Sequence, residues 1–383
     1  MTYRAAAPMV RTNSSKPDPF MPDSMGVTMS NQKQIEVQLL AIPETSGSAL
    51  YGMVDVLATS GRLWREIGGL DGGPELMQPK IVAPDTKPFR CGYGVPVMAD
   101  LTTDDSNVPE ILIIMDIWVG AEDPLADRYD DLKAWLRHCW ANGTTMYSAC
   151  SGSVLLAAAG LLDGYAATSH WVYEDLFREH FPEVNFDPKP ALVFADKTGR
   201  MVTAGGAYSW HDLALHIIAR HISPGEAIST AKFFLMNWHS DGQLPYANLA
   251  RQRPHADSVV RRAEVWLANN LCHADPVSGV VDAVAIPERS LKRRFTQATG
   301  HTIIGYAQNL RMEAAKQALE TSQKPIEQIS ADVGYENVAF FRRLFKRSTG
   351  LTPREYRKLY EPLWEAHNGQ QSDSASELRR KVA

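Results

Sequence analysis

Between Gln34 and Ile222 the sequence alternates short apolar runs, rich in Val, Ile and Leu, with longer stretches of helical periodicity. QIEVQLLAIP (34–43), PKIVAP (79–84) and EILIIMDIW (110–118) have the composition of strands, and the last is apolar almost throughout. Such a run is typical of a strand buried on both faces in the middle of a parallel sheet. Strands that alternate with helices therefore predict an α/β fold, with a largely parallel sheet sandwiched by helices.

The helices of this half have clear stop signals. The amphipathic stretch 124–143 places Leu132, Leu136, Cys139 and Trp140 on one stripe and ends at Gly143. The remaining predicted elements are a helix at 48–64, a strand at 144–149, a helix at 151–160, and a strand, glycine turn and helix within 201–222.

This pattern stops at Asn237. Residues 237–256, NWHSDGQLPYANLARQRPHA, are dominated by Gly, Pro and short polar residues and are predicted to be an interdomain linker. Beyond them we expect an all-α domain to about Tyr360. The predicted division is a disordered tail (1–31), an α/β domain (32–236), the linker (237–256), a helical domain (257–360) and a polar tail (361–383).

The helical half contains an internal repeat. SLKRRFTQATG (290–300) aligns with FFRRLFKRSTG (340–350) at an offset of 50, and Thr302 and Tyr306 recur as Thr352 and Tyr356. A short helix and a tight break precede each copy, which predicts two helix-turn-helix motifs. The stretch 302–320 has helical spacing and is predicted to be the stiff helix that connects them.

Each copy also presents a polar face. Arg289, Lys292 and Arg293 lie opposite the apolar stripe of the first copy, and Ala339, Arg342 and Arg343 lie at equivalent or neighbouring positions of the second. Residues 257–360 contain 16 Lys and Arg against 11 Asp and Glu, whereas the whole chain has 39 against 44. One basic face is usually only a solvated surface, but a duplicated one predicts two helices that enter successive major grooves, roughly 34 Å apart.

Residues 257–360 resemble the DNA-binding domain of the AraC/XylS family of transcription regulators, most clearly in PIEQISADVGYENVAFFRRLFKRSTGLTPREYR. The resemblance implies base-reading roles for a set of residues in the two copies: Arg289, Lys292 and Arg293, then Ala339 and Arg343, with Arg342 and Asn337 as neighbours. Alanine offers no hydrogen bond, so Ala339 would contact at most a thymine methyl.

The stretch ACSGSVLLAAAGLLDGYAATSHW (149–171) is similar to the ThiJ/PfpI branch of the class I glutamine amidotransferase-like superfamily, and more narrowly to GlxA-type regulators. The resemblance implies a flavodoxin-like sheet with Cys150 on a sharp strand-to-helix turn and His170 nearby. At such a turn the helix N-terminus would lower the pKa of the thiol and favour the thiolate.

Three interpretations of Cys150 remain open: a ligand-pocket residue, inert packing, or a catalytic nucleophile. Enzymatic relatives pair this cysteine with an acidic residue in the first helix, where this chain has Ala49, and Asp116-Ile117-Trp118 replaces a glycine pair associated with an oxyanion hole. We therefore expect no catalysis; if the chain were an enzyme, a hydrolase or hydratase, Cys150 and His170 would be its catalytic candidates.

A ligand pocket is expected at the carboxyl ends of the strands. Three tryptophans and a tyrosine among the expected lining residues suggest an aromatic box for a cationic head group, although aromatic residues at such loops more often serve only to pack the core or a lid. The predicted lining is Thr45, Ser46, Trp118, Cys150, Ser151, His170, Trp171, Gly205, Tyr208 and Trp210.

Together these features predict a DNA-binding transcription regulator, an activator, whose α/β domain senses a small metabolite such as an amino acid or quaternary amine. Expected partners are promoter DNA, a small-molecule inducer, RNA polymerase and a second copy bound through the α/β domain. Four cysteines without metal-ligand spacing predict reduced thiols, no metal site and no cofactor. No apolar run is long enough to span a bilayer, and a cytoplasmic location is expected.

Overall fold

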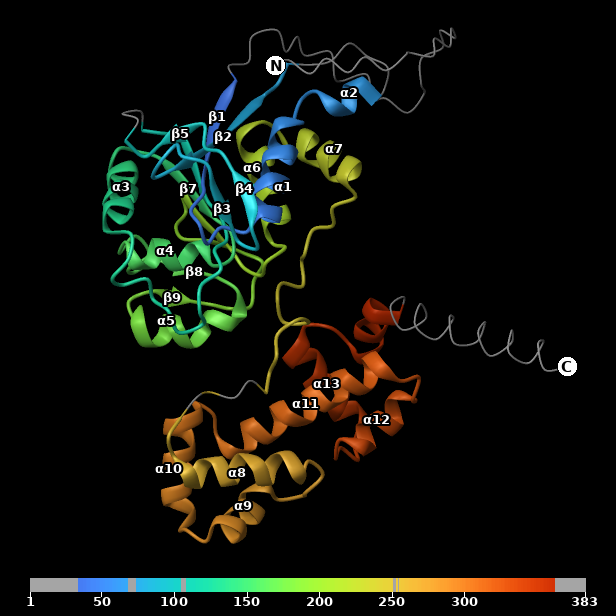
Figure 1. Ribbon diagram of the computed structural model, residues 1–383. Helices are drawn as coiled ribbons and strands as arrows, with labels where there is room; N and C mark the ends of the chain where they lie inside the picture. Colours follow the sequence, from blue (N-terminus) through green and yellow to red (C-terminus); the bar gives the residue numbers. More distant parts are fainter. Residues whose placement is uncertain (1–33, 68–73, 105–107, 251–252, 254, 362–383) are drawn as a thin grey trace, which may run out of the picture.

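The computed structural model describes residues 34–67, 74–104, 108–250, 253 and 255–361 (Figure 1). Strands and helices are interspersed as far as α7, and only helices follow from α8 onward. The predicted tails lie almost wholly outside the described residues. Among those residues, no helix is both long and apolar enough to cross a membrane.

A seven-stranded sheet forms the centre of the first half, in the order β10-β11-β7-β6-β1-β2-β5. All its pairings are parallel except that of β10 with β11. The central strand β6 is buried along its whole length, which confirms the interpretation of its apolar run. The strands are β1 (Ile35–Leu40), β2 (Met77–Ala83), β5 (Leu101–Thr102), β6 (Ile111–Ile114), β7 (Thr145–Ser148), β10 (Leu192–Phe194) and β11 (Met201–Ala204).

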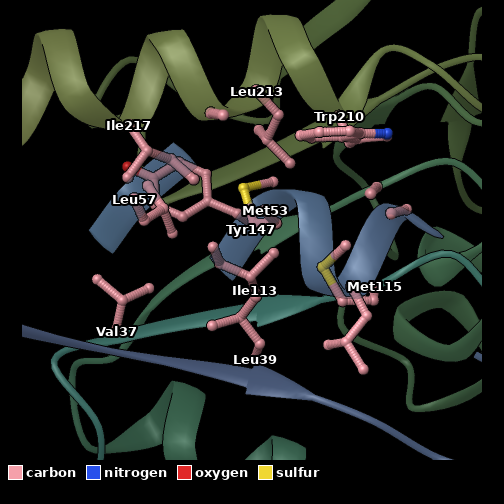
Figure 2. Packing of buried hydrophobic residues seen from close by; sticks show 14 of the residues in the cluster. Val37, Leu39, Met53, Leu57, Ile113, Met115, Tyr147, Trp210, Leu213 and Ile217 are labelled. Carbon is pink, nitrogen blue, oxygen red and sulfur yellow. The ribbon is translucent and has the colours of Figure 1, made fainter. Parts of the chain in front are cut away.

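Helices cover both faces of this sheet. On one face α1 (Gly47–Ala58) and α6 (Trp210–His221) bury Met53, Leu57 and Leu213 against Leu39 and Ile113, as Figure 2 shows. The other face is covered by α3 (Asp130–Ala141), α4 (Gly152–Ala158) and α5 (Glu174–His180). The predicted sandwich of a parallel sheet between helices is confirmed.

Several local details differ from the prediction. The helix expected from 124 begins only at Asp130, because Leu125 and Tyr129 have positive φ angles that a helix cannot include. The elements that the prediction lacked are mostly short: α2 (Leu63–Ile67), β3 (Phe89–Cys91), β4 (Val95–Val97), β5, β8 (Ala166–Ala167), η1 (Trp171–Tyr173), α5, β9 (Asn185–Phe186), β10 and α7 (Pro224–Phe234).

The second half has two cores that share one helix. The first packs α8 (Ser258–Asn269), α9 (Pro276–Val284) and α10 (Glu288–Thr299); the second packs α12 (Ile326–Asp332) and α13 (Val338–Thr349). Helix α11 (Ile303–Thr321) buries residues in both cores, which confirms the predicted connecting helix. Each of α10 and α13 ends at a left-handed glycine, as the repeat requires.

Candidate functional site

Cys150 lies on the turn between β7 and α4, at the carboxyl edge of the sheet. Its φ is 49°, which is unusual for a residue with a side chain, and its carbonyl oxygen accepts hydrogen bonds from Ser153 and Ser169, both at 2.9 Å. A Cβ at Gly152 would lie only 2.5 Å from the carbonyl oxygen of Ile114, so glycine is required there. The sharp strand-to-helix turn implied by the resemblance is present.

The thiol of Cys150 is buried and poorly suited to nucleophilic chemistry. Burial, together with the nearby carboxyl of Asp116, raises the pKa of the Cys150 thiol to about 12. The expectation of a lowered pKa is therefore wrong for this turn, because desolvation outweighs the helix N-terminus. The backbone N–H of His170 lies at the thiol and favours the thiolate only weakly.

Asp116 is a buried acid. The sequence alone drew attention to it only because Asp116-Ile117-Trp118 replaces the glycine pair associated with an oxyanion hole. It follows β6, and burial raises its pKa to about 7 despite a hydrogen bond from Ser46. Its Oδ1 atom is buried without a hydrogen-bond partner among the described residues. A large share of this carboxyl is thus protonated at neutral pH, beside a protonated thiol.

Three predicted pocket residues have structural roles at this edge. Thr45 accepts a hydrogen bond from the N–H of Ile42, and Ser151 both accepts from the N–H of Ile117 and donates to its carbonyl oxygen. The backbone N–H of Ser46 donates to the carbonyl oxygen of Asp116. The Ser151 bonds join the turn after β7 to the loop after β6, and the Ser46 bond joins the loop after β1 to the same loop.

A cavity of about 330 Å³ opens near this edge, within the size range of small-molecule sites. The predicted residues His170, Trp171 and Tyr208 line it, as do Gly206 and Ser209 from the turn before α6. The neighbouring Gly205 is packed against Gln243. Of the predicted pocket residues, the cavity therefore collects only His170, Trp171 and Tyr208, which follow β8 and β11, and none of those that follow β1, β6 and β7.

The remaining wall comes from the linker. His239, Gln243 and Tyr246 line the cavity, although the sequence interpretation assigned them no site role. His239 is held by the fully buried Asp212 of α6, which accepts its backbone N–H and faces its Nδ1 atom, each at 2.8 Å. In the tautomer that carries its proton on Nδ1, facing the carboxylate, Nε2 can accept a hydrogen bond from a ligand.

The three tryptophans proposed for an aromatic box do not meet in one cavity. Trp171 lines the cavity of about 330 Å³, whereas Trp210 lines a second one of about 410 Å³ beside α1. Trp118 lines neither of them and instead packs edge-on against Tyr93, with ring centroids 5.3 Å apart. Rings that do line the first cavity are those of Trp171, Tyr208 and Tyr246.

In the helical half, α10 exposes all three of its predicted base-reading residues. Leu291 and Phe295 are buried in the first core, which turns Arg289, Lys292 and Arg293 to solvent. Lys292 is paired with Glu288 at 2.5 Å on the same helix. Arg293 is exposed and forms no ion pair with a residue that the structure describes.

Helix α13 repeats this arrangement. Ala339, Arg342 and Arg343 are exposed, while Phe341 and Leu344 are buried. Arg342 is paired with Glu327 at 2.7 Å. Asn337 caps the helix, since its side-chain oxygen accepts the N–H of Phe340, and only its amide NH₂ group remains for DNA.

Among the residues that the structure describes, no group of three or more His, Cys, Asp or Glu is placed to hold a metal ion.

Each half of the chain is similar to a known protein family. The DJ-1/PfpI family matches residues 69–220, and a helix-turn-helix domain matches residues 280–359. The HTH-type transcriptional regulator CdhR of Pseudomonas aeruginosa is 26% identical over 291 residues, which are 72% of this chain and 80% of CdhR. GlxA of Rhizobium meliloti, also an HTH-type transcriptional regulator, is 26% identical over 54% of this chain and 63% of its own.

A solved ThiJ/PfpI family protein from Pseudomonas syringae is 18% identical, with a TM-score of 0.44, over 76% of this chain and 98% of its own. The two family matches include Cys150 and the two exposed basic helices respectively. From the family matches, the chain joins a DJ-1/PfpI domain to an AraC-type helix-turn-helix domain, and the curated relatives that it resembles are named HTH-type transcriptional regulators.

Proposed function

We propose that the chain is a sequence-specific activator that binds promoter DNA through α10 and α13 and senses a small metabolite in the cavity of about 330 Å³. The observation that carries this proposal is the equivalent exposure of Arg293 and Arg343 on two helices joined by α11. Bidentate hydrogen bonds from arginine to guanine are the commonest specific contact in the major groove. The proposed domains are the sensor (32–236), the linker (237–256) and the DNA-binding domain (257–360).

The lining of the cavity supports an amino acid or a quaternary amine as the ligand. The rings of Trp171, Tyr208 and Tyr246 can face a cationic group, and Nε2 of His239 can accept a hydrogen bond from an ammonium. A free ammonium would use both features, whereas a quaternary amine would use only the rings. Loss of affinity on His239→Ala therefore distinguishes the two ligand classes.

Sensing is better supported than catalysis at Cys150. A nucleophile needs a substantial thiolate population, and a thiol of pKa about 12 has almost none at neutral pH. Cys150 also does not line the cavity itself. We therefore propose a structural role for Cys150, and Cys150→Ser should leave the ligand response intact.

We further propose that two copies associate through the sensor domain and that the bound activator contacts RNA polymerase. Large apolar side chains exposed on the sensor domain, Tyr93, Met98 and Trp118, support a protein contact there. Sedimentation of the full chain tests the first point, because it would give the mass of two chains.

The central experiment selects DNA from a random pool with the full chain and measures affinity for the selected fragment by fluorescence anisotropy at two salt concentrations. Arg293→Ala/Arg343→Ala should weaken binding by at least about 30-fold, since each base contact is worth about 1 kcal/mol or more. The matched control is Arg62→Ala/Arg90→Ala, which removes the same charge from the other half. Selection of no preferred sequence by the wild-type chain would refute the proposal.

The same fragment serves to identify the ligand. The twenty amino acids and glycine betaine are added singly, and one of them should change the affinity for the fragment. Trp171→Ala should abolish that change without altering DNA binding in its absence.

A further inference from the structure

The linker is bound to the sensor domain at the cavity. Gln243 is almost fully buried: its Nε2 donates to the carbonyl oxygen of Ser169 at 2.8 Å, and its Oε1 accepts the N–H of Trp171 at 3.2 Å. Its own N–H donates to the carbonyl oxygen of Lys189 at 2.7 Å. Gly242 makes this close approach possible, because a Cβ there would lie 2.3 Å from the same oxygen. Gln243 thus forms part of the cavity wall and is anchored to the sensor domain on three sides.

The same segment is bound to α11 only a few residues later. Lys316 donates to the carbonyl oxygen of Ala247 at 2.6 Å, and Glu313 accepts the N–H of Leu249 at 2.8 Å. Lys316 and Glu313 are themselves paired at 2.9 Å. A buried lysine is costly unless its charge is paired and hydrogen-bonded, so this contact is specific and not an incidental surface touch.

The two attachment points are too close together to move independently. Only three residues separate Gln243 from Ala247, and the N–H of Ala247 donates to the carbonyl oxygen of Gln243 at 3.1 Å. A shift of the cavity wall at Gln243 therefore also displaces the carbonyl group of Ala247, to which Lys316 donates its hydrogen bond. Helix α11 belongs to both helical cores, so its displacement reaches α10 and α13.

We propose that residues 239–249 act as a lid on the ligand cavity and as a clasp on α11, and that ligand occupancy reaches the two DNA-binding helices through the Gln243–Ala247–Lys316 connection. This inference rests on the proposed function and names its regulatory route. It assigns Gln243, Lys316 and Glu313 as positioning residues, none of which contacts DNA bases.

A double-mutant cycle on the full chain tests this route, with affinity for the DNA fragment selected by the wild-type chain as the readout. Gln243→Ala releases the lid, and Lys316→Met releases the clasp. Each should change DNA affinity by about five-fold or more in the same direction, within the range of typical coupling between sites. The double variant should match a single one, because either release already breaks the route.

Lys133 provides a closely matched control. It is as buried as Lys316 (6% and 5% exposed), is paired with an acid three residues earlier, Asp130, and donates to a loop carbonyl, that of Ala126, but it lies on α3. Lys133→Met should leave DNA affinity unchanged. If Lys316→Met does not fold, as judged by circular dichroism, Glu313→Gln replaces it, since it removes the charge and keeps the shape.

Effects of Gln243→Ala and Lys316→Met that simply add, within about two-fold, would overturn the inference, because independent sites are additive. Unchanged affinity in both single variants would overturn it as well. The proposed function fails separately, if the wild-type chain selects no DNA sequence at all.

Discussion

Arg293 and Arg294 are adjacent on α10, yet the structure predicts opposite consequences for their replacement. The side chain of Arg293 is exposed and forms no ion pair with a described residue. Arg294 instead donates two hydrogen bonds to Asp257, from Nε to Oδ2 at 2.8 Å and from Nη2 to Oδ1 at 2.7 Å. Asp257 is also the N-cap of α8, so Arg294 orients α10 against its neighbour.

The expected magnitudes follow from these contacts. Arg293→Ala should lose one bidentate base contact, about 1 to 3 kcal/mol, or about 5- to 150-fold in affinity for the selected fragment. Arg294→Ala should lower the urea midpoint of unfolding only slightly, because the two side chains are 38% and 23% exposed and water screens their charges. Its preference for the selected fragment over single-base variants should stay within about two-fold of wild type.

Anisotropy titrations against the selected fragment and its single-base variants measure the first effect, and urea unfolding followed by circular dichroism measures the second. Both variants remove one positive charge, so a general loss of charge would affect them equally. If Arg294→Ala relaxed sequence preference as much as Arg293→Ala, the assignment of Arg293 to the DNA-facing side of α10 would be wrong.

Three further predictions concern the sensor domain. Iodoacetamide at neutral pH should modify the exposed Cys272 long before Cys150, whose thiol is buried with a pKa of about 12; equal rates by mass spectrometry would contradict the buried turn. Burial lowers the pKa values of His216 and His221 from 6.5 to about 4, so their neutral forms stabilise the fold fully above pH 6.5. That stability should be lost as the pH falls from 6.5 through 4, and a thermal midpoint unchanged over this range would refute it. Gly152→Ala should destabilise the chain by about 1 to 3 kcal/mol, because the new methyl meets backbone oxygens that cannot move aside; an unchanged urea midpoint would show that the turn can relax.

The sheet, its principal helices and the repeated helical motif could be predicted from sequence because each depends on local periodicity. The apolar run 110–118 and the apolar stripe of α10 indicate which side chains are buried, independently of the segments that pack against them. The late start of α3 could not be predicted, because it depends on left-handed backbone at Leu125 and Tyr129 that no residue type there favours.

The candidate site was harder to predict, because it depends on contacts between distant segments. His170, Trp171 and Tyr208 were found from their positions after strands. His239 and Gln243 lie in a segment rich in Gly, Pro and polar residues, which usually indicates a spacer, and only the fold shows them against Asp212 and Ser169. The depth of burial that sets the acidity of Cys150 is likewise invisible in sequence.

The length of α11 has a consequence for how such regulators can diversify. The helix has 19 residues, about 28 Å at 1.5 Å per residue, and each residue also turns it by about 100°. Inserting or deleting one residue would rotate one DNA-binding helix around the axis of α11 relative to the other, and both could no longer face the same side of a duplex. Changes in the length of α11 should therefore be poorly tolerated, whereas substitutions of cavity residues outside 239–249 leave this geometry unchanged. Under the proposed function, a different small ligand would need only point substitutions in the cavity, whereas a different spacing between α10 and α13 would need a change in the length of α11.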